Sequence, residues 1–290
     1  MSIAGSFTGS LDAALTLSVG SATDVGLRRS ANEDSLLVGH PIYAVADGMG
    51  GHEAGDLASQ AVIAQLRAIV GAEGATPEDV ADAIDAAHGS VRLIADGKPR
   101  GAGSTLTGAA VIEQNGRAHW LIFNVGDSRV YRLRGNEFGQ LTVDHSIAQE
   151  MVDAGTLAKE DVGTYAGRNV ITKAIGAEYS DADYWLYPIV SGEKLLLCSD
   201  GLSGEVTDDA MARTLLREPD AQGAADSLVR QALDNGGRDN VTVVVVEVVD
   251  GGLDPMLDEE TGVVDSDAGD SVDELEANTI EIPGRVQRED

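Results

Sequence analysis

Acidic side chains recur in this sequence where runs of apolar residues begin or end. At three of the five boundaries the acid stands beside a glycine, a pairing that is typical of a turn when it occurs once. Their repetition at several such boundaries favours a shared site. The acids are Glu33 and Asp34 before residues 35–38, Asp47 after 43–46, Asp127 after 118–125, Asp200 after 194–198 and Asp239 before 241–249.

Carboxylates that meet at one end of a sheet repel each other, and this repulsion raises their pKa values. Mg²⁺ and Mn²⁺ relieve the repulsion because both ions prefer oxygen ligands. A glycine next to an acid also lets the backbone carbonyl approach an ion closely. The pattern therefore predicts a divalent metal site, provided that the strands lie side by side.

The elements that must position these acids are short strands and amphipathic helices. Apolar and β-branched runs predict strands over 104–113, 117–125, 129–134, 193–199 and 241–249. Apolar residues at helical spacing predict a helix over 57–70 and a longer one over 76–94, where Thr76, Pro77 and Asp79 form a capping-box start. Strands follow strands and helices follow helices, which favours a layered α+β domain over a doubly wound one.

Composition excludes several functional classes. The chain has 290 residues and a net charge of −29, which argues against nucleic acid or an anionic membrane as the main partner. No apolar run reaches the roughly 18 residues of a membrane span, and the first residues lack the basic start of a signal peptide. Cys198 is the only cysteine, so an internal disulfide is impossible and a reducing, cytoplasmic location is expected.

Composition also divides the chain into three parts. Residues 1–16 are small and weakly apolar and are expected to form an N-terminal arm. Residues 17–250 form the expected folded domain. Residues 251–290 hold 13 acids and two arginines, a net charge of −11, and are expected to be a disordered acidic tail.

Seven motifs, taken in order, resemble the signature blocks of one enzyme family. They are RRSANEDS, VADGMGG, GAGSTL, NVGDSRVYRL, TVDHS, LLLCSDGLSGEV and GGRDNVTVVVVEV. The chain resembles the metal-dependent serine/threonine protein phosphatases of type 2C (the PPM family), and most of all their bacterial members, over residues 17–250. The resemblance implies a four-layer α-β-β-α sandwich of two antiparallel sheets flanked by helices.

The resemblance also implies an activity and its partners. The expected enzyme is a monomeric phosphatase of phosphoserine and phosphothreonine proteins that opposes bacterial serine/threonine kinases. Two or three Mn²⁺ or Mg²⁺ ions are its expected cofactors. In the implied mechanism a hydroxide that bridges two ions attacks phosphorus directly, without a phosphoenzyme.

Each site residue takes its expected role from the matching motif. Arg29 would bind the substrate phosphate, whereas its neighbour Arg28 is expected to be a solvated charge. Together with Arg29, Asp47 and Asp34 make up the expected catalytic set. The expected metal ligands are Asp47 as the bridge between two ions, Gly48 through its carbonyl, Asp200 and Asp239 at the second ion, Glu33 and Asp34 directly or through water, and Asp127 with Asp200 at a third, weaker ion.

The sequence departs from the family pattern at the proton donor. Many eukaryotic members carry a histidine, proposed as the general acid, where this chain has Met49. His52 is expected to be structural, so a metal-bound water is the expected donor. His145 is expected to order a loop. Residues 146–179 occupy the position of the family's flap and are expected to tune substrate choice.

Other phosphatase chemistries fit the sequence less well. Cys198 has no arginine at the spacing of a cysteine phosphatase and is expected to lie in the core. Asp181 and Asp183 have the spacing of an aspartyl phosphotransferase but follow no apolar strand, and GAGSTLTG lacks the lysine of a phosphate-binding loop. The remaining alternatives are a catalytically inactive pseudophosphatase that acts as a regulatory binding module, and an active enzyme with a narrow substrate range.

Overall fold

A computed structural model describes residues 15–50, 53–72, 74–99, 101–178, 180–254 and 278–279. The strands are β1 (Thr16–Asp24), β2 (Asp34–Gly39), β3 (Ile42–Gly50), β4 (Ala102–Ser104), β5 (Leu106–Gln114), β6 (Arg117–Val125), β7 (Arg129–Arg134), β8 (Glu137–Gln140), β9 (Asp183–Pro188), β10 (Lys194–Cys198), β11 (Val241–Asp250) and β12 (Asn278–Thr279). The helices are α1 (Glu53–Leu66), α2 (Pro77–Ala95), α3 (Ile147–Asp153), α4 (Asp200–Ser203), α5 (Asp208–Arg217) and α6 (Ala221–Asp234), with 3₁₀ turns η1 (Arg67–Ile69) and η2 (Lys159–Thr164).

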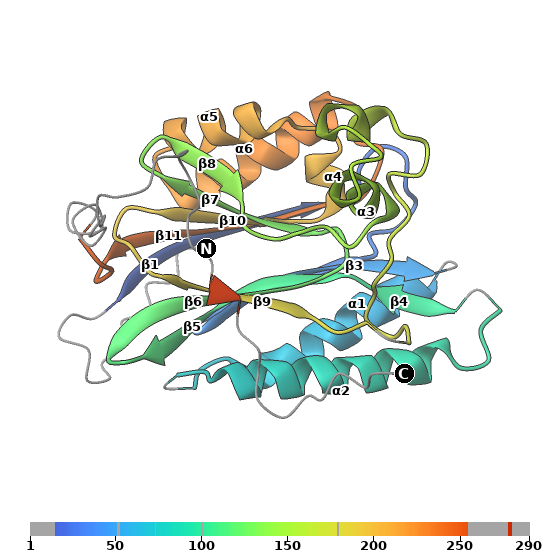
Figure 1. The fold of residues 1–290 in the computed structure, drawn as a ribbon, viewed down its shortest axis with the longest axis horizontal. Coiled ribbons are helices and arrows are strands. Elements are labelled where there is room, and N and C mark those ends of the chain that lie inside the picture. Colours follow the sequence, from blue (N-terminus) through green and yellow to red (C-terminus); the bar gives the residue numbers. More distant parts are fainter. Residues whose placement is uncertain are drawn as a thin grey trace.

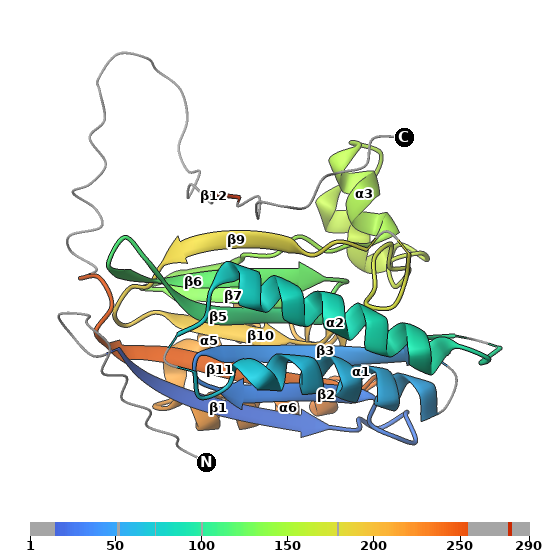
Figure 2. The same cartoon turned by 90° about the horizontal axis from the view of Figure 1, so that it is seen from below.

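Two antiparallel sheets lie face to face in the middle of the molecule (Figure 1). Within the described residues, one sheet has the strand order β1-β11-β10-β7-β8, and the other has the order β12-β9-β6-β5-β3-β2 with β4 paired to β3. Helices α5 and α6 cover the outer face of the first sheet, and α1 and α2 cover the outer face of the second (Figure 2). This arrangement confirms the predicted α-β-β-α sandwich.

The β-branched run 241–249 shows why the layers form. In β11, Val244 and Val246 pack into the apolar cluster between the sheets. The alternate residues Val243 and Val245 pack into the cluster beneath α5 and α6. Because side chains alternate across a strand, a strand with valine at nearly every position is buried on both faces and must lie between two layers.

The predicted elements are confirmed, with shifts at their ends. The capping box of α2 forms as expected, with the Asp79 N–H donating to Thr76 Oγ1 (3.1 Å) and the Thr76 N–H donating to Asp79 Oδ2 (2.9 Å). The predicted strand 104–113 is divided at Thr105 into β4 and β5, both of which pair with β3, and the Thr105 N–H donates to the Asp47 carbonyl of β3 (2.8 Å). The predicted helix 57–70 starts at Glu53 and ends at Leu66.

Described structure extends slightly beyond both predicted domain limits, residues 17 and 250, and these limits stay a prediction. The first strand begins at Thr16 and pairs with β11 along the sheet edge. At the other end, backbone contacts continue past Asp250: the Leu253 N–H donates to the Ile189 carbonyl (2.8 Å) and the Ser191 N–H donates to the Leu253 carbonyl (3.0 Å). The predicted arm and acidic tail fall mostly outside the described residues. No helix within the described residues has the length and apolar character needed to cross a membrane.

Candidate active site

The predicted acids come from both sheets and gather where strands end. Asp34 on β2 stands directly opposite Asp47 on β3 in the antiparallel register. Asp127 follows β6, Asp200 begins α4 immediately after β10, and Asp239 lies two residues before β11. The charges of the other four act on Asp47 and raise its pKa. The five aspartates therefore form one cluster, as their positions along the sequence predict.

Burial and mutual repulsion make this cluster costly to ionise. Burial, with added repulsion from Asp200, raises the pKa of both Asp34 and Asp127 to about 7. Burial comes first and neighbouring carboxylates second in raising the pKa of Asp47 well above its usual range, and Asp200 is shifted in the same direction. Buried acids that repel each other in this way are typical of a site that is completed by a cation.

Two carboxylate oxygens have no protein partner. The Oδ1 atoms of Asp34 and Asp200 are buried and accept no hydrogen bond from the described residues. Buried polar atoms are normally satisfied, so such atoms require an explanation such as an ion or water. Oxygen-only ligands of this kind suit Mg²⁺ or Mn²⁺. The residues present therefore fit the divalent ions that the sequence motifs imply.

The carboxylates are not arranged around a single point, as the ligands of one bound ion would be. Among the described residues, no three Asp, Glu, His or Cys side chains form a ready metal-binding group. Some carboxylates bind protein donors instead: Arg29 Nη2 donates to Asp239 Oδ2 (2.6 Å), and Ser199 Oγ donates to Asp34 Oδ2 (2.8 Å). Arg29 is half exposed, so its side chain can leave Asp239 without breaking a packed core.

Gly48 allows the backbone to enter this crowded region. Its N–H donates to the Glu33 carbonyl (3.1 Å). A Cβ atom at position 48 would lie 2.1 Å from the Gly55 carbonyl oxygen and 2.6 Å from that of Glu33. Any side chain here would push α1 away from β3, so only glycine permits this approach.

Asn240 is a positioning residue that the sequence interpretation did not single out. Its buried amide accepts the Glu33 N–H (2.9 Å) and donates to the carbonyls of Val25 (2.9 Å) and Ala31 (2.9 Å). These bonds fasten the segment that carries Arg29 to the start of β11. One sequence feature could have identified Asn240: it directly follows a candidate metal ligand, Asp239, and directly precedes a strand.

The hydroxyl groups of Ser199 and Thr105 also position the cluster, through hydrogen bonds to its backbone and to one of its carboxylates. Ser199 Oγ, besides its bond to Asp34, accepts the Thr242 N–H (3.0 Å). Thr105 Oγ1 accepts the Asp47 N–H (3.0 Å) and is hydrogen-bonded to Ser128 Oγ (2.7 Å). Sequence analysis missed both residues, because nothing local distinguishes them from other serines and threonines.

His145 links the cluster to the predicted flap, as a loop-ordering residue would. Its Nδ1 accepts the Gly126 N–H (3.1 Å), so its Nε2 carries the proton and donates to Asp183 Oδ2 (3.0 Å). Lys173 in the flap donates to Asp183 Oδ1 (2.9 Å). The flap contains α3 and η2, while its last residue, Tyr179, lies outside the described residues.

The remaining candidates that the structure describes are not part of the cluster. Cys198 is fully buried in β10, and this burial raises its pKa to about 12, which confirms a core role. Met49 pairs across to Gly103 on β4 and is half-buried. His52 lies outside the described residues. Arg28 is exposed and takes no part in the Arg29 ion pair.

Comparison with known proteins agrees with this geometry. A family model described as protein phosphatase 2C matches residues 28–235. The serine/threonine protein phosphatase PstP of Mycobacterium tuberculosis is 36% identical over 250 residues, which are 84% of this chain and 48% of that protein. The serine/threonine phosphatase stp of Listeria monocytogenes is 36% identical over 239 residues, covering 78% of this chain and 93% of the relative. The chain thus spans about half the length of the mycobacterial relative.

Solved structures show the same fold. The crystal structure of M. tuberculosis PstP superposes with a TM-score of 0.75 at 35% identity and covers 80% of this chain and 98% of that one. A structure described as the catalytic domain of PstP in complex with two manganese ions gives a TM-score of 0.71 at 34% identity and covers 81% of this chain and 99% of that one. With the family match, the shared fold and the clustered acids in agreement, the chain belongs to the bacterial branch of the protein phosphatase 2C family.

Proposed function

We propose that this chain is a metal-dependent phosphatase that hydrolyses phosphoserine and phosphothreonine in proteins. The observation that carries the proposal is the cluster of five aspartates from both sheets, with two buried oxygens unpartnered and an arginine at its edge. A catalytically inactive pseudophosphatase would be expected to lack one or more of these groups. The same features therefore favour the active enzyme.

The proposed ligands differ in what they can contribute. The charges of Asp34, Asp127, Asp200 and Asp239 all act on Asp47, so its carboxylate would be the ligand shared by two ions. The carbonyl of Gly48 would bind one of them. Ions bound here would supply a water nucleophile of lowered pKa and would neutralise charge on the phosphoryl oxygens. The proposed ligands are Glu33, Asp34, Asp47, Gly48, Asp127, Asp200 and Asp239, with Mn²⁺ or Mg²⁺ as the ion and the Asp127–Asp200 pair as a third, weaker site.

Arg29 is the proposed phosphate-binding residue. Its guanidinium is exposed and bonds Asp239 through Nη2 (2.6 Å), so it lies next to the proposed ions and still reaches solvent. A phosphate monoester is a better partner than one carboxylate because it can accept two parallel bonds from the guanidinium fork. Substrate binding would then exchange the Asp239 bond for bonds to phosphate and release Asp239 to its proposed ion.

The wider role is also a proposal. The relatives are named serine/threonine phosphatases, and this chain, by similarity, would act on phosphoproteins and oppose a serine/threonine kinase. We place the enzyme in the cytoplasm as a monomer.

Met49 carries no transferable proton, so residue 49 does not act as a general acid.

The decisive experiment measures hydrolysis and ion binding separately. The full chain should hydrolyse p-nitrophenyl phosphate and a phosphothreonine peptide with Mn²⁺ or Mg²⁺, and excess chelator should stop both reactions. Asp47→Asn should abolish turnover and weaken Mn²⁺ binding in calorimetry while the circular dichroism spectrum is kept. Asp82→Asn, at an exposed position of α2, is the matched control and should behave as wild type.

Two outcomes would contradict the proposal. Full activity in excess chelator or in Asp47→Asn would exclude the metal mechanism. A folded wild-type chain that binds Mn²⁺ and hydrolyses neither substrate would favour the pseudophosphatase.

A further inference from the structure

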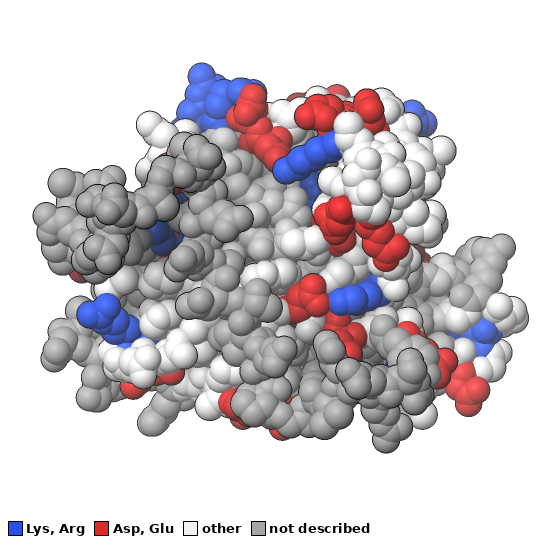
Figure 3. All heavy atoms as spheres, in the orientation of Figure 1, with Lys and Arg blue, Asp and Glu red and all other residues white. Residues whose placement is uncertain are grey.

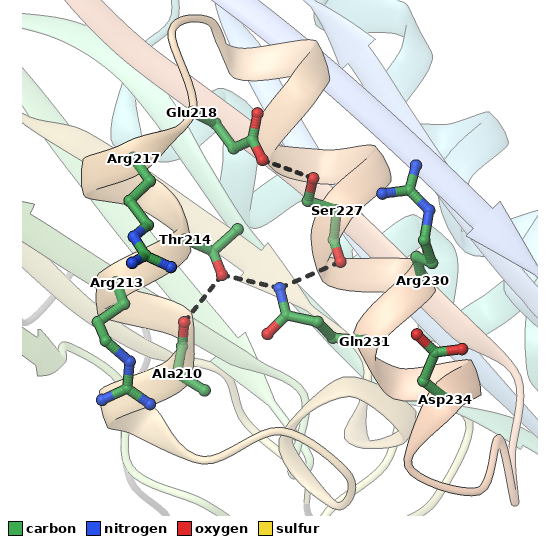
Figure 4. Close-up of a pocket in the computed structure, with 9 residues that line it drawn as sticks. All are labelled: Ala210, Arg213, Thr214, Arg217, Glu218, Ser227, Arg230, Gln231 and Asp234. Carbon is green, nitrogen blue, oxygen red and sulfur yellow. Dashed lines mark hydrogen bonds between the residues drawn. The ribbon is translucent and has the colours of Figure 1, made fainter.

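A second charged hollow lies on the outer helical layer, away from the aspartate cluster. It is a cavity of about 260 Å³ between α5 and α6. Figure 4 shows it with its lining side chains, and none of them belongs to the candidate active site. They are Ala210, Arg213, Thr214, Arg217, Glu218, Ser227, Arg230, Gln231 and Asp234.

A hydrogen-bonded polar bridge spans the two helices within this pocket. Gln231 Nε2 on α6 donates to Thr214 Oγ1 on α5 (2.8 Å), and Thr214 Oγ1 donates in turn to the Ala210 carbonyl (2.9 Å). Figure 4 shows Arg213 and Arg217 on one side of this bridge and Arg230 on the other. The bridge holds the helices at a fixed separation, so the pocket is a formed feature of the helical layer.

The three arginines of the pocket lack carboxylate partners. Among the described residues, none of Arg213, Arg217 and Arg230 lies within ion-pair distance of an Asp or Glu, although the chain carries 49 acids against 20 bases. Arg213 and Arg217 are also one turn apart on α5, where like charges repel by about 0.2–0.5 kcal/mol. Six bases elsewhere in the described residues do pair with an acid: Arg29, Arg129, Arg134, Arg238, Lys173 and Lys194.

The acids of the pocket form no ion pair with these arginines among the described residues. Glu218 Oε1 accepts a hydrogen bond from Ser227 Oγ (2.7 Å), and Asp234 lies beyond ion-pair reach of the arginines. Lys and Arg side chains also gather over α5 on the surface (Figure 3). An anion that bridges two guanidinium groups would remove their repulsion and gain charge-assisted hydrogen bonds.

We propose that the pocket between α5 and α6 docks a phosphoryl group of a phosphorylated protein, separately from the phosphate that is hydrolysed. The proposal rests on the proposed function, because a phosphatase meets phosphorylated segments as substrates. Guanidinium groups match phosphate oxygens in pairs, and the pocket is open to solvent because its arginines are exposed. A substrate with several phosphates would then bind at two places and gain affinity over a substrate with one.

The test compares substrates that differ in phosphate number. The double variant Arg217→Gln/Arg230→Gln removes one cation from each helix. The control Arg67→Gln/Arg117→Gln removes two exposed cations elsewhere. KM and kcat are measured with Mn²⁺ for p-nitrophenyl phosphate, for a singly phosphorylated peptide and for multiply phosphorylated casein.

The pocket variant should raise KM for casein about tenfold, equivalent to about 1.4 kcal/mol. Both constants for the two smaller substrates should stay at the wild-type values, and the control should change nothing. An unchanged KM for casein, or an equal rise in the control, overturns the proposal. Hydrolysis of p-nitrophenyl phosphate and of the singly phosphorylated peptide by all variants shows that the proposed function stands even if the docking site fails.

A second arm distinguishes a protein-borne phosphate from a free one. The full chain is titrated with inorganic phosphate after chelation, and backbone amide shifts are followed by NMR. Docking of phosphoproteins predicts weak shifts confined to α5 and α6 together with the KM effect on casein. Shifts at α5 and α6 without any KM effect show a site for free phosphate and overturn the docking role.

Discussion

Replacement of Asn240 by alanine should destabilise the active-site region and lower activity together. The Asn240 amide makes three hydrogen bonds, to the Glu33 N–H and to the carbonyls of Val25 and Ala31. All three partners lie in the segment that carries Arg29. The same segment is also joined to the residues before β11 by the Leu27 N–H, which donates to the Gly237 carbonyl (2.7 Å), and by the exposed Arg29–Asp239 pair, but Asn240 supplies three of the side-chain bonds.

The size of the effect follows from the number of bonds. Each intramolecular hydrogen bond contributes about 0.5–1.5 kcal/mol net, so the loss of three should cost about 2–4 kcal/mol. In a domain of this size, that corresponds to a fall in Tm of about 5–15 °C. Displacement of Arg29 by about 1 Å should lower kcat/KM by about tenfold to a hundredfold.

The assay combines urea unfolding with steady-state kinetics on p-nitrophenyl phosphate. Asn240→Asp is a second variant: it keeps an acceptor for the Glu33 N–H but turns a carboxylate toward two carbonyl oxygens, so it should be at least as damaging. Asn235→Ala is the control, because Asn235 is exposed and its amide makes one hydrogen bond, to the Glu205 carbonyl (2.8 Å). Its cost should stay near 1 kcal/mol or below. Wild-type stability and kcat/KM in Asn240→Ala would refute the assignment of Asn240 as a positioning residue.

Three further predictions concern the cluster and the flap. Arg29→Ala should raise KM for a phosphopeptide by about tenfold to a hundredfold, because a charged hydrogen-bond partner of phosphate is lost; an unchanged KM would place phosphate binding elsewhere. The pKa values of Asp34 and Asp127 are raised to about 7, so the folded, metal-free protein binds more protons than the unfolded chain between about pH 4 and 7, and its Tm should fall as pH rises through this window. Mn²⁺ should restore that loss near pH 7.5, and a pH-independent Tm in chelator would contradict the raised pKa values. Asp183→Asn should weaken the bonds to His145 and Lys173 and make residues 146–179 more sensitive to limited proteolysis; equal cleavage rates in mutant and wild type would show that this triad does not secure the flap.

Local sequence features predicted many of the elements, although not β1, β9, α5 or α6, and they predicted the chemistry of the site. The capping box at Thr76 depends on residues three apart, so the start of α2 is visible in the sequence. The valines of β11 require burial on both faces, which indicates a central strand in a layered fold. Acids at the boundaries of apolar runs predict an oxygen-rich metal site if those strand ends lie together, and here the ends come from both sheets.

Tertiary structure alone decided how the site is held. Ser199 bonds Asp34 across 165 residues of sequence, and Asn240 bonds Glu33 across 207. A hydroxyl or amide has no sequence signature for such a partner, because the contact exists only once strand order and register are set. The same holds for the arginines of α5 and α6, which look like ordinary surface charges until the packing of the two helices places them around one cavity. Composition and short-range pattern thus determine which groups are available, whereas long-range pairing of strands and helices determines which of them meet.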